Sequence, residues 1–256
     1  MSVPRDKILR FLEETFRISL TPDNSYNGLQ FDGKKNIQHL VTGVDASEAF
    51  LREAIRRKAD LAIVHHGLFW KGNELKKIDR FMKRKLEVMI RGDLNLYGIH
   101  LPLDSHPDLG NNAVLARLLG LTDLTPFSEY QGQKIGFWGR FPRPLSRTAL
   151  VKKITAAIGP LTGRIEFGAT SIRTLGIVSG GGGNSVMDPE AQDGRLDALL
   201  TGEIIHQIYG VTEERQQNLY AAGHYATERF GVQALGEKLA EVFRLNHEFI
   251  DLPTGL

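Results

Sequence analysis

Short runs rich in valine, isoleucine and leucine alternate with longer amphipathic segments along the chain. The runs at residues 39–47, 60–67 and 95–104 are typical of buried strands, and apolar residues at helical spacing cover Glu48–Lys58 and Asn111–Leu119. Parallel strands need long crossover connections, so this strand–helix–strand alternation predicts an α/β protein with substantial parallel pairing.

The second half of the chain repeats the apolar pattern of the first half. Residues 172–181 resemble 37–46, and residues 196–206 resemble 59–69. An internal duplication that produced two related α/β units explains this likeness. Convergence is the alternative, because buried strands of unrelated α/β proteins look alike.

Composition limits the chemistry that is open to the chain. It contains no cysteine, so any metal ion must be held by histidine, carboxylate, carbonyl or water. Its 32 basic and 30 acidic side chains give a net charge of +2, which excludes nucleic-acid binding driven by bulk charge but leaves a local patch open. Neither a signal peptide nor a run of ~20 apolar residues occurs, so we expect a cytoplasmic protein without a membrane partner.

Residues that suit a metal ion occur where the expected strands end. His65 and His66 follow a buried run, Asp104 follows the next run in a proline-broken loop, and His224 and Glu228 are spaced to share one helical face. Ligands of α/β sheets bind at the carboxyl ends of the strands. A lone histidine there is more often a hydrogen-bonding residue, but three histidines and two carboxylates together favour a site for one or two divalent ions.

Three further features have open roles. His100, inside the expected third strand, is either a core histidine or a support for the ligands. Glu203 and His206 either orient ligands, touch a substrate or are structural. The loop Gly180–Gly183 lets backbone amides converge on a phosphate, but it lacks the lysine of a P-loop, and a tight turn without a ligand is the alternative.

Five segments that span nearly the whole chain are specific enough to compare with known families. They are DNSYNGLQ (23–30), IVHHGLFWKG (63–72), LYGIHLPLDSHPDLGNNAVLA (96–116), LLTGEIIH (199–206) and AGHYATERFGVQAL (222–235). They resemble the Nif-three-like family, also described as GTP cyclohydrolase type 2 homologues, in its short bacterial form.

The resemblance implies a dinuclear metal centre at the bottom of a cleft. Its implied ligands are His65, His66, Asp104, His224 and Glu228, all of which are present here. It also implies two divalent ions per chain, whose identity (zinc, iron, manganese or nickel) stays open, and a homo-oligomer in the form of a toroidal hexamer.

The expected architecture follows from both lines of argument. We expect the α/β fold class: two related α/β units with mixed sheets flanked by helices and a metal cleft between them. We place a metal-binding α/β unit at residues 1–128 plus 212–256, and a second α/β unit at residues 129–211. A length of 256 residues suits either one large domain or two modest ones.

Two functions from different classes are consistent with these features. The first is a metal-dependent hydrolase of a nucleotide or phosphorylated heterocycle, similar to a GTP cyclohydrolase, in which two divalent ions activate water and Glu228 bridges them. The second is a non-catalytic, metal-binding hexameric scaffold or regulator with protein or nucleic-acid partners. Five protein ligands leave two ions with open coordination positions, which favours catalysis. No catalytic residue beyond the ligands is assigned.

Overall fold

The computed structural model describes residues 2–72 and 77–256. The chain divides into two compact units: unit 1 comprises Met1–Leu103 and Val232–Leu252, and unit 2 comprises Asp104–Gly231 and Pro253–Leu256. Among the described residues, none of the helices combines the length and apolar character that spanning a bilayer demands.

The division differs from the boundaries at 128/129 and 211/212 that the sequence suggests. Residues 104–128 and 212–231 belong to unit 2 rather than to the unit that begins the chain. The reason is packing: side chains of residues 115–121 and 220–222 lie in the same buried cluster as the strands of the second sheet.

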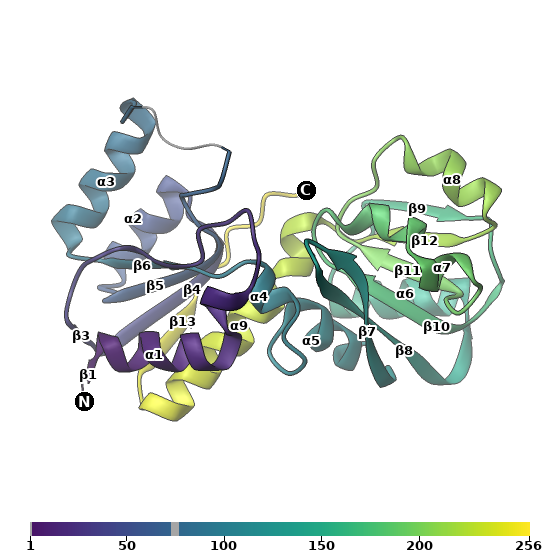
Figure 1. The fold of residues 1–256 in the computed structure, drawn as a ribbon, viewed down its shortest axis with the longest axis horizontal. Coiled ribbons are helices and arrows are strands. Elements are labelled where there is room, and N and C mark those ends of the chain that lie inside the picture. Colours follow the sequence, from purple (N-terminus) through teal and green to yellow (C-terminus); the bar gives the residue numbers. More distant parts are fainter. Residues whose placement is uncertain (1, 73–76) are drawn as a thin grey trace. The chain divides into compact units, whose positions relative to one another are not determined.

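Unit 1 is built on a five-stranded sheet in the order β13-β4-β5-β6-β2 (Figure 1). All neighbours pair in parallel except β2, which is antiparallel to β6. Its strands are β1 (Val3–Pro4), β2 (Gly28–Phe31), β3 (Asn36–Ile37), β4 (His39–Asp45), β5 (Leu61–His66), β6 (Asn95–Gly98) and β13 (Asn246–Phe249), with β1 and β3 forming a separate antiparallel pair. Five of the six residues of β5 are buried, as in a strand covered on both faces.

Helices cover both faces of this sheet (Figure 1). On one face, Phe50 and Leu51 of α2 and Met89 of α3 pack in a cluster with Val41 and Val64 of the sheet. On the other face lie α1 and the later part of α9, whose Phe11 and Phe243 rings meet edge to face. The helical segments are α1 (Arg5–Phe16), η1 (Ile18–Leu20), α2 (Glu48–Arg56), α3 (Arg80–Gly92), α4 (Leu101–Asp104) and α9 (His224–Phe243). Both α4 and α9 run across the division between the units.

Unit 2 is built on a six-stranded mixed sheet in the order β7-β8-β10-β11-β12-β9. Its strands are β7 (Thr122–Tyr130), β8 (Gln133–Ser146), β9 (Gly163–Glu166), β10 (Ser171–Val178), β11 (Ala198–Thr201) and β12 (Asn218–Ala221). The parallel series β10-β11-β12 ends on antiparallel β9, just as β4-β5-β6 ends on antiparallel β2. This shared arrangement agrees with the repeated sequence pattern.

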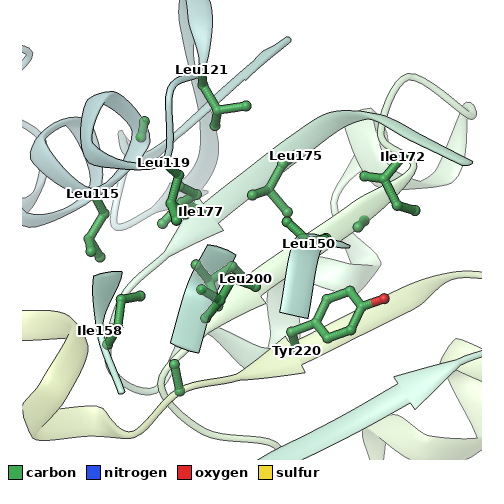
Figure 2. Packing of buried hydrophobic residues seen from close by; sticks show 14 of the residues in the cluster. Leu115, Leu119, Leu121, Leu150, Ile158, Ile172, Leu175, Ile177, Leu200 and Tyr220 are labelled. Carbon is green, nitrogen blue, oxygen red and sulfur yellow. The ribbon is translucent and has the colours of Figure 1, made fainter. Parts of the chain in front are cut away.

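Two apolar clusters cover the faces of the second sheet. Figure 2 shows one of them, in which Leu115 of α5 and Leu150 of α6 pack with Ile177, Leu200 and Tyr220 of the strands. The other joins Val186, Ala191 and Ile208 to strand side chains. The helical segments are α5 (Asn111–Leu118), α6 (Arg147–Ala157), η2 (Gly182–Met187), α7 (Pro189–Gln192) and α8 (Ile208–Glu214). The predicted α/β class, with two related units of mixed sheets flanked by helices, is confirmed.

One predicted strand is shorter than the sequence suggests. The sequence predicts a strand over 95–104, but β6 ends at Gly98 and α4 follows, so His100 lies outside the strand and Asp104 lies in a short helix. Side chains replace the sheet partner here: the backbone N–H of His100 donates to Asn27 Oδ1 and that of Leu101 donates to Asp23 Oδ2. The chain therefore turns where the strand would have continued.

Candidate metal centre

Two histidines of unit 1 are held through one ring nitrogen each. At the end of β5, His65 Nδ1 donates to the carbonyl oxygen of Ile99 (2.9 Å) and His66 Nδ1 donates to Asp45 Oδ1 (2.8 Å). The ring centroids are 4.7 Å apart. When Nδ1 carries the proton of a neutral imidazole, Nε2 carries the lone pair, so both rings are oriented to offer Nε2 to a ligand.

His100 joins these two histidines within unit 1. One ligand nitrogen from each of the three imidazoles lies within 4.8 Å of the others. Like the other two, the His100 ring donates through Nδ1 to an oxygen, here Asp23 Oδ1 at 2.9 Å. A cluster of three imidazoles, each fixed through Nδ1, is a donor set that suits zinc, iron or nickel.

In unit 2, Asp104 is held by side chains from two other segments. It is 5% exposed, its Oδ1 accepts a hydrogen bond from Asn111 Nδ2 (2.9 Å), and Ser179 Oγ lies 3.4 Å from the same oxygen. Asn111 is fully buried and also accepts from the backbone N–H of Gly231 (2.6 Å) in α9. Asn111 therefore links Asp104 to the helix that carries the next two candidates.

His224 and Glu228 face each other at the start of α9, as their spacing predicts. His224 Nε2 lies 3.1 Å from Glu228 Oε2, and His224 Nδ1 donates to Glu203 Oε1 at 2.6 Å. The hydrogen bond to Glu228 and the charges of both glutamates outweigh burial and raise the pKa of His224 to about 9. Without a metal ion, this histidine is therefore protonated at neutral pH and pairs with two carboxylates.

The glycine loop packs directly on this pair. Gly180 has φ +59°, its N–H donates to Thr227 Oγ1 (3.0 Å), and a Cβ at this position would come 2.0 Å from Glu228 Oε1 and 3.0 Å from His224 Nε2. Its carbonyl oxygen accepts from the N–H groups of Gly202 and Glu203. The loop thus serves as a tight turn that leaves room for the carboxylate of Glu228.

This packing predicts a selective effect of one methyl group. We expect Gly180→Ala to displace the Glu228 carboxylate and to weaken metal binding at least about tenfold, because a Cβ has no space there and L residues disfavour this backbone conformation. The matched control is Gly181→Ala, whose Cβ meets nothing within 4 Å. Isothermal titration of both variants with Zn²⁺ checks this, and equal affinities would contradict it.

The two remaining residues with open roles lie at the edge of a hollow in unit 2. This hollow, of about 840 Å³, lies at the carboxyl ends of β11 and β12, and Glu203, His206, Tyr209 and Ala221 line it. Glu203 reaches from the hollow to His224, while His206 is exposed. Glu203 thereby orients His224, a candidate metal ligand, which is one of the three roles that the sequence left open for it.

Each unit contains a β-sheet flanked by helices, and imidazole and carboxylate groups lie at the strand ends. The chain is therefore an α/β protein with a candidate metal centre. A family model described as Duf34/NIF3 (NGG1p interacting factor 3) matches residues 3–254. The chain therefore belongs to the Duf34/NIF3 family.

Individual relatives match the chain over nearly its full length. A protein of Pyrococcus horikoshii named GTP cyclohydrolase 1 type 2 homolog is 42% identical over 98% of this chain and 99% of its own. A Deinococcus radiodurans protein of the same name is 41% identical over 99% of this chain and 95% of its own. The crystal structure of TTHA1606 from Thermus thermophilus matches with a TM-score of 0.89 and 39% identity, covering 99% of this chain and all of that one. The name that the first two relatives share expresses likeness to a GTP cyclohydrolase rather than an activity.

Proposed function

We propose that the protein is a metal-dependent hydrolase in which His65, His66, Asp104, His224 and Glu228 hold two divalent ions. The observation that carries this proposal is how these side chains are held. The imidazoles of His65, His66 and His224 are each fixed through Nδ1 by an oxygen acceptor. The carboxylate of Asp104 is fixed by the buried side-chain amide of Asn111. Partners of this kind orient metal ligands in proteins and raise their basicity.

The donor set fits divalent ions of intermediate hardness. Three imidazole nitrogens and two carboxylates suit zinc, iron, manganese or nickel, and Gly180 leaves the room that the Glu228 carboxylate occupies beside His224. When bound, such ions supply Lewis acidity and make hydroxide available near neutral pH. The protein's own part is to orient the ligands and to leave coordination positions open for water and substrate.

A nucleotide or another phosphorylated heterocycle is the substrate class that we propose. The names of the relatives point to GTP-like compounds, and the hollow beside Glu203 gives unit 2 a concave surface at the strand ends, where α/β proteins bind ligands. The experiment is an assay of the metal-loaded protein against nucleotides and phosphoesters. Ring opening would show a cyclohydrolase, and phosphate release would show a phosphoesterase.

A non-catalytic metal-binding scaffold or regulator is the second candidate. The partly exposed side chain of His224 and the open hollow favour the hydrolase, because a structural metal site is closed by protein ligands. Complete absence of turnover across the panel, with both ions bound, would favour the scaffold.

Metal affinity is expected to depend on pH through His224. Because the metal-free protein holds the pKa of His224 at about 9, a metal ion must displace this proton at neutral pH. Apparent affinity should therefore rise about tenfold per pH unit from pH 7 to pH 9 and then level off. Competition titration with a chromophoric chelator, corrected for the chelator's own pH dependence, measures this. A flat profile over this range would contradict the proposed role of His224.

We also propose that the chain forms a homo-oligomer, with a hexameric ring as the expected form. Ile78, Phe81 and Ile90, in and beside α3, are each more than half exposed, so they are available to be buried against another copy of the chain. Light scattering should give a mass of about six times 28.5 kDa. A monomer at all concentrations would contradict this part of the proposal.

A further inference from the structure

A carboxylate–histidine pair in unit 1 lies outside the five proposed ligands. Asp23, in the segment before β2, accepts a hydrogen bond from His100 Nδ1, with Oδ1 at 2.9 Å and Oδ2 at 3.2 Å. Asp23 is 3% exposed, and the His100 side chain is 18% exposed. A buried acid that holds a partly accessible imidazole requires an explanation, because burying a charge is costly unless it is paired.

Asp23 is held in place independently of the histidine. Its Oδ1 also accepts from the N–H of Ser25 (2.9 Å), and its Oδ2 accepts from Asn27 Nδ2 (2.8 Å) and the N–H of Leu101 (2.9 Å). Burial alone raises the pKa of Asp23, but the hydrogen bonds that it accepts, above all the one from His100, lower it to about 2. The carboxylate is therefore ionised and immobile, as a group that orients a neighbour needs to be.

The ring of His100 is fixed between aromatic neighbours. Its centroid lies 5.0 Å from that of His65, 5.6 Å from that of His66 and 5.0 Å from the ring of Trp70, which meets it at 71°. Because Nδ1 donates to Asp23, Nε2 of the neutral ring carries a lone pair. The His100 ring therefore lies beside the rings of both proposed ligands of unit 1, and its side chain is partly accessible.

We propose that His100 recognises the molecule that takes the open coordination position of the metal centre, and that Asp23 is its positioning residue. Nε2 of His100 accepts a hydrogen bond from a hydroxyl of that molecule, which makes OH-bearing oxyanions such as hydrogen phosphate the ligand class. This inference rests on the proposed function and adds a sixth residue to the site. That residue, His100, contacts the bound molecule and does not coordinate the ions.

The test uses the full chain loaded with Co²⁺, whose visible spectrum changes when an anion binds. We expect His100→Ala to retain the cobalt content of the wild type but to need about 10- to 100-fold more inorganic phosphate for half of the spectral change, since a hydrogen bond involving a charged group is lost. His100→Gln is the second variant, should alanine disturb the turn before α4. Circular dichroism confirms the fold of both.

Asp23 is tested through the same spectrum. Asp23→Asn keeps the shape of the side chain but removes its charge, so we expect a smaller loss of phosphate affinity than in His100→Ala. A merely structural role of Asp23 would lower thermal stability and leave the phosphate titration unchanged.

The control is another carboxylate–histidine pair in the same unit. His39 Nε2 lies 3.0 Å from Glu248 Oε1 at the start of β4, the edge of the sheet opposite to the strand ends that carry the ligands. His39→Ala should leave both cobalt content and phosphate affinity unchanged.

Two results would overturn the inference while leaving the proposed function intact. If His100→Ala loses cobalt, His100 is a ligand of the ion. If it binds phosphate like the wild type, the pair is structural. A wild-type protein that binds no metal ion would instead refute the proposed function, and the inference would fall with it.

Discussion

Asp104→Asn should lower hydrolysis of the best nucleotide substrate by at least about 100-fold, which corresponds to about 2.7 kcal/mol of transition-state stabilisation. The substitution removes the negative charge that holds a divalent ion and keeps the size of the side chain. An asparagine oxygen can still accept the hydrogen bond that Asn111 Nδ2 donates to Asp104 in the structure. The variant should therefore melt within a few degrees of the metal-free wild type and keep its oligomeric state.

A neighbouring acid provides the control for this variant. Asp108 is exposed and lies four residues further along the same segment, so Asp108→Asn changes the net charge equally without touching the proposed centre. Steady-state kinetics of both variants, with metal in excess, separates the two effects. Full turnover in Asp104→Asn would refute the metal-dependent mechanism.

His66→Ala and Glu228→Ala should each lose at least one of two bound ions. His66 is oriented by Asp45 (2.8 Å), and Glu228 is buried beside His224 (3.1 Å), so each variant removes a donor atom that the fold holds in place. Elemental analysis after dialysis measures the ion content per chain.

The exposed Glu237 lies on the same helix as Glu228, and Glu237→Ala is the matched control. It should keep the ion content of the wild type. If His66→Ala and Glu228→Ala both keep that content too, the ligand assignment is wrong.

The sequence was most informative where chemistry-bearing residues end buried strands. His65 and His66 are the last two residues of β5, directly after an apolar run that is buried as in a strand covered on both faces. The helical spacing of His224 and Glu228 likewise predicts the contact that the structure shows. Patterns of this kind are local, so one segment is enough to reveal them.

The supporting residues could not be predicted in this way. Asp23 reaches His100 across 77 positions, and Asn111 reaches Gly231 across 120, so these partnerships depend on the tertiary fold. The turn at His100 has the same origin, because the side chains of Asn27 and Asp23 take the backbone N–H groups that would otherwise extend β6. Asp23 does lie in the segment DNSYNGLQ that resembles the family, and this was its one signal in the sequence.

The central claim is that His65, His66, Asp104, His224 and Glu228 together hold two divalent ions. The most direct measurement is X-ray diffraction from crystals of the metal-loaded protein, with data collected on both sides of the absorption edge of the metal. The account predicts two anomalous peaks per chain, with these five side chains as the protein ligands and Glu228 in contact with both ions. Anomalous peaks that none of these residues touches, or no peak at all, would contradict it.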